Sequence, residues 1–322
     1  MPKIDFPVNP IREKVYSRDE LFSTFNINDV DSYITTLDFK AYSDFKVSGG
    51  SFPSSYYVGM MRSLHDFSIW NDIQEIMQRE KIIGIMGGHE MERTQYGIYA
   101  KIAKLAYQLT NKGFLITSGG GSGAMEATHL GAYFSRYSED VLDEALKYMS
   151  ARPKLPENYS KIIDDNGVLD KNIADKLHDW IKPAFELLQK YPIGGESLAV
   201  PTWLYGHEPP CPFASHIAKY YQNSIREDGL LAIAKYGVIY CEGKAGTIQE
   251  IFQDANQNYY KTVDWFSPMV FLDKDYWTKK FPVKNILDKL IAKDDNSKYI
   301  KYTDDINEVV DFLCKFKPVY KK

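Results

Sequence analysis

The chain has 322 residues, of which 44% are hydrophobic and 25% are charged, and its formal net charge is −4 at pH 7. That length accommodates one large domain with additions or two modest ones, and the apolar content suffices for a buried core. Acidic and basic residues are interspersed, so no basic stripe indicates binding to nucleic acid, and we expect no nucleic-acid partner.

Cysteines, histidines and apolar runs exclude further classes of protein. The three cysteines are odd in number and lack CxxC spacing, which argues against a disulfide framework and a zinc site. The six histidines include no HxxxH or HxH pair, so we expect no bound metal. No apolar run approaches the ~20 residues of a membrane helix, and the first residues lack the apolar core of a signal peptide. We therefore expect a cytoplasmic protein without membrane contact.

Residues 1–78 are rich in aromatic and turn-forming residues and are predicted to form an N-terminal extension. Within them, Ser48-Gly49-Gly50-Ser51 resembles a ligand loop, but Phe52-Pro53 follows where a helix would have to begin. We interpret the remainder, 79–322, as one domain.

An alternation of strands and helices begins at Ile82, where a short apolar run ends in Gly87-Gly88-His89. The next helix is predicted from apolar residues at spacings of four, three and four, namely Ile98, Ile102, Leu105 and Leu109. Gly113 marks the end of this helix. A strand over 114–117 then leads through glycines into a helix over about 122–134. Residues 138–191 are charged and helical in texture, and we interpret them as a helical insertion broken by Pro153, Pro156 and Pro183.

The second half of the chain continues the alternation. Strands are predicted near 197–204, over 237–241 and over 269–272. Pro212 stands where a helix can begin, and that helix is predicted to carry Ile217, Tyr220, Tyr221 and Ile225. A further helix carries Ile248, Ile251, Phe252, Ala255 and Tyr259 on one face, and two closing helices are predicted around 286–291 and 309–313. Strands alternating with helices predict an α/β fold with a Rossmann-like doubly wound parallel sheet flanked by helices.

The most informative segment is 238–250, which reads as a buried strand, a glycine turn and the start of a helix carrying a carboxylate. Glycines let the backbone pass close to a ligand, and a helix start favours an anion such as phosphate. Glu250 lies about one turn beyond Thr247, so it is expected to face the sugar of the same ligand. One glycine turn is a weak signal. Here three strands end in such turns, and ligands of open parallel sheets bind at the carboxyl ends of strands.

Two of these turns carry a resemblance to a known family. Gly-Gly-Gly-Ser-Gly-Ala-Met-Glu-Ala (119–127) and Glu-Gly-Lys-Ala-Gly-Thr-Ile-Gln-Glu (242–250) resemble the LOG-type family, long labelled lysine decarboxylase-like, whose second motif is Pro-Gly-Gly-x-Gly-Thr-x-x-Glu. The chain is also similar to the family's bacterial pyrimidine/purine nucleotide 5′-monophosphate nucleosidases at Gly87-Gly88-His89, 123–127 and Glu208-Pro209-Pro210. The resemblance spans roughly residues 80–275.

The resemblance implies a nucleoside 5′-monophosphate phosphoribohydrolase, which hydrolyses the N-glycosidic bond of AMP or a similar nucleotide to free base and ribose 5-phosphate, without a cofactor. It also implies a homodimer or larger homo-oligomer. The family's catalytic glutamate falls on Glu250. Its arginine falls on Arg226 if one residue is gapped, which leaves Glu227 as the neighbour to distinguish. Glu126 is either a second carboxylate at the ribose or a helix-start residue that complements the dipole.

The predicted substrate-binding residues are Gly87, Gly88, His89, Gly119, Gly120, Gly121, Gly123, Met125, His207, Glu208, Gly243, Lys244, Gly246 and Thr247. One departure stands out, because Glu242-Gly243-Lys244 replaces the family's Pro-Gly-Gly. Lys244 either reaches the phosphate or is solvated, and the departure keeps open a non-catalytic nucleotide-binding or sensing protein on the same fold. The segment is not a Walker A loop, and nothing identifies a pyridoxal phosphate site.

Overall fold

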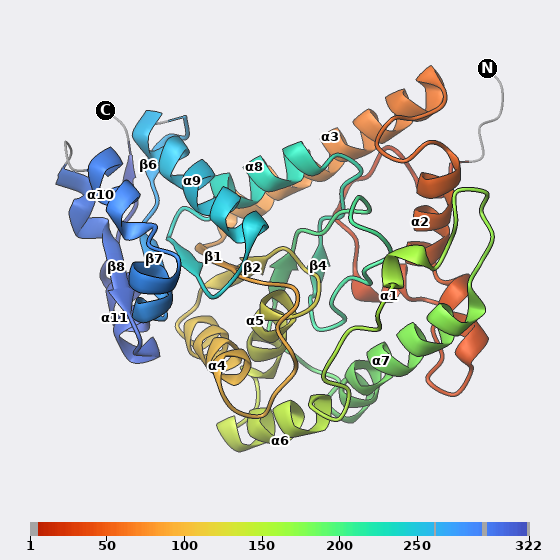
Figure 1. The fold of residues 1–322 in the computed structure, drawn as a ribbon, viewed down its shortest axis with the longest axis horizontal. Helices are drawn as coiled ribbons and strands as arrows, with labels where there is room; N and C mark the ends of the chain where they lie inside the picture. The colour runs from red at the N-terminus through yellow and green to blue at the C-terminus, as the bar shows by residue number, and fades with distance from the viewer. Residues whose placement is uncertain (1–5, 261, 292–294, 321–322) are drawn as a thin grey trace.

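The computed structural model describes residues 6–260, 262–291 and 295–320 (Figure 1). Its centre is a sheet of seven strands in the order β4-β3-β2-β1-β5-β7-β8, all parallel. The strands are β1 (Ile82–Met86), β2 (Leu115–Ser118), β3 (Ser197–Ala199), β4 (His216–Ile217), β5 (Val238–Tyr240), β7 (Met269–Leu272) and β8 (Ile300–Thr303). The predicted Rossmann-like α/β fold is confirmed.

The order of the strands places a topological switch at the middle of the sheet. The chain runs outward from β1 through β2 and β3 to β4, then returns so that β5 pairs with the other side of β1. Gly84 of β1 is in register with Thr117 of β2 and with Val238 of β5. Ligands of doubly wound sheets bind at such a switch, outside the carboxyl ends of the strands.

Helices cover both faces of the sheet because alternate strand residues point to opposite sides. Ile83 and Ile85 of β1 pack with one layer of helices, whereas Ile82 and Met86 pack with the other. The first layer contains α4 (Ile98–Asn111), α5 (Ala124–Phe134), α6 (Glu139–Met149) and α11 (Ile306–Lys315). The second contains α3 (Tyr56–Arg79), α8 (Asn223–Ile233), α9 (Ala245–Tyr260) and α10 (Lys284–Ile291), and Figure 1 shows α3, α8 and α9 together above the strands.

The segment before the sheet forms α1 (Arg18–Leu21), the 3-10 turn η1 (Val30–Thr35), α2 (Leu37–Val47) and α3. Its aromatic residues share one apolar cluster with the sheet rather than forming a separate core. Tyr16 exchanges two backbone hydrogen bonds with Ile217 of the edge strand β4, with N···O distances of 2.9 and 2.8 Å. This segment therefore covers an edge that would otherwise expose unpaired backbone groups.

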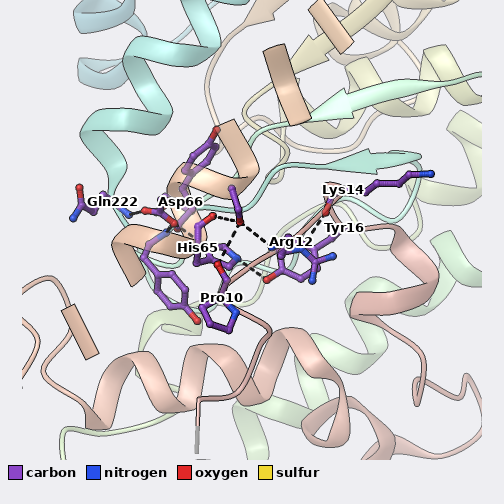
Figure 2. A network of polar contacts seen from close by, with 11 residues as sticks. Pro10, Arg12, Lys14, Tyr16, His65, Asp66 and Gln222 are labelled. Atoms are coloured by element: carbon purple, nitrogen blue, oxygen red, sulfur yellow. Dashed lines mark hydrogen bonds and ion pairs between the residues drawn. The ribbon is translucent and has the colours of Figure 1, made fainter. Parts of the chain in front are cut away.

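A buried polar network ties α3 to α8 (Figure 2). The Asp66 carboxylate accepts hydrogen bonds from the backbone N–H groups of Tyr221 (3.0 Å) and Gln222 (2.8 Å), just before α8 begins. His65 lies between Asp66 and Tyr16, with Nδ1 2.9 Å from Asp66 Oδ1 and Nε2 2.7 Å from the Tyr16 hydroxyl. Asp66 thus satisfies amides at a helix start that have no partner within the helix.

The insertion over 138–191 is helical, as predicted. It contains α6, the short turn η2 (Tyr159–Lys161) and α7 (Lys171–Lys190). Pro153 and Pro156 lie between these helices, but Pro183 lies inside α7 and does not end it. The prediction of a break at Pro183 is therefore wrong. Packing of the apolar face of α7 against the core outweighs the one backbone hydrogen bond that proline removes.

The helix predicted to begin at Pro212 is also wrong. Ile217 belongs to β4, which is in register with β3, and α8 begins only at Asn223. The apolar spacing that suggests a helix arises because Ile217 is held in the sheet, while Tyr221 packs against His65 of α3 and Phe45 of α2 and Tyr220 is buried in the same apolar cluster. The strand predicted near 197–204 is shorter, ending at Ala199, two residues before Pro201.

The two closing helices are present as α10 and α11, but the strand β8 between them was not predicted. Its run Ile300-Lys301-Tyr302-Thr303 alternates apolar and polar residues, but over only four positions, and pairing with β7 completes the strand. The π-helical turn η3 (Tyr276–Lys280) follows β7, η4 (Asp295–Tyr299) precedes β8, and β6 (Trp265–Phe266) pairs antiparallel with β9 (Val319–Tyr320). None of the helices in the described part of the chain has an apolar stretch long enough to span a bilayer.

Candidate functional site

Three glycine turns meet at one edge of the sheet. The first, 87–89, follows β1, the second, 119–123, follows β2, and the third, 243–246, follows β5. The N–H of Gly88 donates to the carbonyl of Glu242 (2.8 Å), and the N–H of Ala124 donates to the carbonyl of Gly88 (3.1 Å). The Ser122 hydroxyl donates to the carbonyl of His89 (2.8 Å). The first turn therefore stands between the other two and is bonded to both, at the switch between β1 and β5.

These turns require glycine because other groups of the chain come too close to the backbone to leave room for a Cβ atom. A Cβ on Gly119 would collide with Arg226 Nη2 and would lie 2.5 Å from Met125 Sδ. A Cβ on Gly123, whose φ is +67°, would collide with the carbonyl oxygen of Gly88. At Gly121 the same atom would strike the Glu208 carboxylate. Side chains here would push apart the functional groups that the turns bring together.

The turns surround an open cavity of about 810 Å³. Most of the residues predicted as site residues line it: Gly87, Gly88, His89, Gly119, Gly121, Met125, Glu208, Arg226, Gly243, Lys244, Gly246, Thr247 and Glu250. The volume is in the range of small-molecule sites, which are typically 300–1,000 Å³. Residues from five separate segments of the chain therefore line one cavity.

The start of α9 forms one wall of the cavity. At this helix start, the N–H of Ile248 donates to the carbonyl of Lys244 (3.0 Å). The amides of the preceding residues, Ala245 to Thr247, have no acceptor within the helix, which is how helix starts bind anions. The Tyr276 hydroxyl donates a hydrogen bond to the carbonyl of Gly243 (2.6 Å), which helps to fix the glycine turn before α9.

Glu250 faces Arg226 across the cavity. Glu250 Oε1 lies 4.0 Å from Arg226 Nη1, and the two side chains are only 14% and 9% exposed. Arg226 is held by its Nε, which donates to the carbonyl of Val200 (2.8 Å). A second carboxylate, Glu227, has its Oε1 3.9 Å from the same Nη1. One guanidinium therefore serves two carboxylates.

The protonation of Glu250 follows from this arrangement. Burial raises the pKa of Glu250 to about 7, the neighbouring Glu227 also raises it, and Arg226 acts in the opposite direction. Glu227 is fixed by hydrogen bonds from Asn223 Nδ2 (2.6 Å), the Tyr205 hydroxyl (3.2 Å) and Gln249 Nε2 (2.8 Å). A carboxyl group that titrates near neutral pH can both accept and donate a proton, which suits general acid–base chemistry.

The departure at Glu242-Gly243-Lys244 changes the charge of the cavity mouth. Lys244 is exposed and forms an ion pair with Glu90, which bridges the third and first glycine turns. Glu242 lies beside Asp273, and burial together with this carboxyl neighbour raises the pKa of Glu242. Carboxylates thus outnumber cations in the lining, so binding of an anion here depends on the backbone amides together with Lys244, Lys280 and Arg226.

Four predicted site residues do not line this cavity. Gly120 and Gly123 belong to the second turn but face away from the cavity, toward Ala199 and toward Gly88 respectively. Glu126 is buried and receives hydrogen bonds from Arg93 Nε and Nη2 (both 2.6 Å) and from the Tyr99 hydroxyl (2.8 Å). Those bonds occupy Glu126, which makes it a poor candidate for contact with a ribose here.

His207 is also turned away, because it is 1% exposed and packs against the rings of Tyr33, Phe39 and Tyr42. Burial lowers the pKa of its imidazole to about 4, so it is neutral at physiological pH. Glu208, the next residue, does line the cavity and accepts hydrogen bonds from the Ser122 N–H (2.6 Å) and hydroxyl (2.8 Å).

Several lining residues were missed by the sequence, among them Tyr159, Thr202, Tyr205, Gln249, Tyr276 and Lys280. Tyr159 comes from the helical insertion and Tyr276 from the π-helical turn after β7. No spacing in the sequence connects these segments to the glycine turns. Gln249 directly precedes Glu250, but adjacent positions of a helix point to different sides, so the prediction of Glu250 did not extend to it. Glu227, named above as the neighbour to distinguish from Arg226, also lines the cavity.

No family model matches this sequence, and a search of curated proteins finds no match. Among the described residues, no three histidine, cysteine or acidic side chains gather in a way that could hold a metal ion. The fold and the site together define the class of this protein. It is an α/β protein with a Rossmann-like parallel sheet and a cavity lined by carboxylates at the topological switch of that sheet.

Proposed function

We propose that this chain is a nucleoside 5′-monophosphate phosphoribohydrolase. The observation that carries the proposal is that Glu250 and the anion-binding start of α9 open into the same cavity, one helical turn apart. Three residues along a helix correspond to about 4.5 Å, roughly the distance from a 5′-phosphate to the sugar it is attached to. The resemblance to the LOG-type family in both glycine motifs supports the same reading.

In the proposed arrangement, the amides from Ala245 to Thr247 hold the 5′-phosphate and Lys244 leaves Glu90 to join it. Glu250 then faces the anomeric carbon. As the bond between that carbon and the base breaks, its electrons go to the base nitrogen and positive charge develops on the ribose ring. The Glu250 carboxylate stabilises this charge and takes a proton from the attacking water, whose oxygen bonds to the anomeric carbon. The departing base takes up a proton from solvent.

Arg226 favours the ionised form of Glu250, which is the form that can accept a proton. Without a cation nearby, burial and Glu227 would hold Glu250 in its protonated form, which cannot accept a proton from water. Arg226 also offers a planar donor fork to a ribose hydroxyl or to the phosphate.

The test is direct. Purified protein is incubated with AMP, GMP, IMP, CMP and UMP, and free base and ribose 5-phosphate are measured, with adenosine as the control that lacks the phosphate. We expect release from at least one monophosphate, none from adenosine, and a loss of at least 100-fold in Glu250→Gln. Absence of base release across the whole panel would reject the enzyme.

A second candidate is a non-catalytic nucleotide-binding or sensing protein, which the departure from the family's Pro-Gly-Gly keeps open. At this departure Lys244 is paired with Glu90 and Glu242 adds a carboxylate to the cavity lining. Tight monophosphate binding without turnover, unaffected by Glu250→Gln, would support this candidate. The cytoplasmic location expected from the sequence stays a prediction.

A further inference from the structure

The carboxylate of Glu208 reaches the cavity with one oxygen bonded and the other open. Glu208 Oε1 accepts hydrogen bonds from the Ser122 N–H (2.6 Å) and from the Ser122 hydroxyl (2.8 Å). Glu208 Oε2 makes no hydrogen bond within the described part of the chain, and the residue lines the cavity. Each carboxylate oxygen can accept two hydrogen bonds, so Oε2 is placed to accept from a ligand.

The chain holds Glu208 in a rigid position. Pro209-Pro210 follows it directly and restricts the backbone there. The N–H of Cys211 then donates to the carbonyl of Gly120 (2.8 Å), which fixes this segment to the second glycine turn. A Cβ on Gly121 would lie 2.9 Å from Glu208 Oε2, so the backbone of that turn passes directly beside the carboxylate. An acceptor that is already fixed loses little entropy when a ligand binds, which favours selective recognition.

An aromatic ring stands beside this carboxylate. Tyr159, in the turn η2 of the helical insertion, also lines the cavity. Gly206 lies against that turn, because a Cβ on Gly206 would come 3.6 Å from Tyr159 Cε2. Burial raises the pKa of Tyr159 to about 12 and the charge of Glu208 acts in the same direction, so the phenol is neutral and lies within electrostatic range of Glu208. The two side chains therefore share one end of the cavity.

This end of the cavity is where the base of a bound nucleotide would lie. In the proposed arrangement the phosphate binds after β5, at the start of α9, and Glu250 faces the anomeric carbon. Base and phosphate are attached to opposite ends of the ribose, so the base extends from β5 toward the loop after β3, which carries Glu208. Neighbouring strands lie about 4.8 Å apart, which separates the ends of β5 and β3 by about 14 Å, a gap that a ribose and a base can bridge.

We propose that Glu208 selects nucleotides whose base carries an amino group at the position of N6 in adenine or N4 in cytosine. The inference rests on the proposed function and names the class of substrate for the same site. Every base has a π-face, so stacking on Tyr159 supplies affinity without selection. Glu208 Oε2 accepts a hydrogen bond from the amino group, whereas hypoxanthine and uracil present a keto oxygen at that position, which a carboxylate repels.

The experiment compares AMP with IMP and CMP with UMP, because the members of each pair differ only at this edge of the base. Dissociation constants are measured by calorimetry on the full-length chain carrying Glu250→Gln, so that hydrolysis does not deplete the ligand. We expect AMP and CMP to bind at least about 10-fold more tightly than IMP and UMP. Tyr159→Leu in the same background should weaken all four by about 5-fold and leave the preference unchanged.

Glu208→Gln in the same background separates recognition of the base from a structural role. The amide oxygen of glutamine still accepts from Ser122, while its NH2 group replaces Oε2 and donates to a keto oxygen. The preference should therefore invert toward IMP and UMP, whereas loss of a purely structural contact would change all four affinities alike. Glu157→Gln is the matched control, since Glu157 is exposed outside this cavity, and should leave the preference unchanged.

Equal affinities within both pairs overturn the proposal, as does a preference that Glu208→Gln leaves unchanged, or an absence of binding by all four nucleotides. Should Glu208→Gln fail to fold, N6,N6-dimethyl-AMP, which lacks the amino N–H donors, must bind as weakly as IMP when Glu208 is intact. Base release by the natural chain is measured separately. Its absence rejects the enzyme, whereas the order of the four affinities decides the role of Glu208.

Discussion

Glu250 illustrates how few side chains determine the chemistry of the candidate site. Its pKa is set by three influences that act at once: burial and Glu227 raise it, and Arg226 lowers it. Arg226 Nη1 lies 4.0 Å from Glu250 Oε1 and 3.9 Å from Glu227 Oε1. Because the two neighbours act in opposite directions, their removal should move the titration of Glu250 in opposite directions.

We therefore expect Arg226→Met to raise the pKa of Glu250 above its value of about 7, and Glu227→Gln to lower it. The titration can be followed by carboxyl NMR of the apo protein. If the chain releases base, the ascending limb of kcat/KM against pH should lie near pH 7 and move with the same signs. Shifts of equal sign in the two variants would contradict this account of the site.

Gly119 shows a steric constraint at the same scale. Gly119→Ala is expected to displace Arg226 or the second turn, because the added Cβ would overlap the guanidinium. Overpacking of this kind costs about 1–3 kcal/mol of unfolding free energy, which denaturant titration measures. Gly246→Ala is the matched control, since its Cβ meets no atom within 4 Å. Equal stability of the two variants would show that the close approach at Gly119 is unimportant.

Among the elements, α8 decides the geometry of the site, because it carries both Arg226 and Glu227. Its start is not fixed by its own sequence, since its N-cap residue Gln222 makes no side-chain cap bond. The cap comes from Asp66 of α3, more than 150 residues away in the chain. The position of a catalytic candidate thus depends on a carboxylate in the N-terminal segment.

Asp66→Ala should therefore destabilise the protein by about 2–4 kcal/mol, because the backbone amides of Tyr221 and Gln222 and the His65 ring lose their partner. We also expect weaker monophosphate binding, since the start of α8 is released. Unfolding by urea and binding by calorimetry would measure the two effects. Asp19→Ala, at a side chain that is 84% exposed, should change neither. A stable Asp66→Ala protein would mean that α8 is held elsewhere.

For the whole molecule, buried titrating groups act on stability in opposite directions. Burial raises the pKa of both Glu250 and Asp254 to about 7, so the folded state holds protons that the unfolded state releases, and stability falls as pH rises from about 4 to 7. Burial lowers the pKa of His129 to about 3 and of His207 to about 4. For these imidazoles the unfolded state binds more protons, so stability falls as pH decreases from about 6.5 to 4.

Removing the two buried carboxyl groups should leave the pH dependence of stability that the two buried histidines cause. In Glu250→Gln with Asp254→Asn, we expect unfolding free energy to rise between pH 4.5 and pH 7, by on the order of 5 kcal/mol relative to the natural chain. Urea midpoints at the two pH values provide the measurement. His207→Phe should change the pH dependence with the opposite sign. Parallel pH profiles for all three proteins would contradict the assigned shifts.

The sequence by itself determined the α/β fold and its strands at β1, β2, β5 and β7, because their apolar runs end in glycine turns and alternate with amphipathic helices. It also indicated that these turns meet, since parallel strands present their carboxyl ends at one edge. Residues of those turns therefore line the cavity as expected.

Only the tertiary structure decided the rest. Glu126 and His207 carry the right chemistry in the right turns, yet Arg93 and a group of aromatic rings occupy them. The edge strand β4 and the position of α8 depend on Tyr16 and Asp66, partners distant in sequence. The physical reason is that local spacing specifies which backbone conformation is favoured, whereas side-chain partners depend on which segments the folded chain brings together.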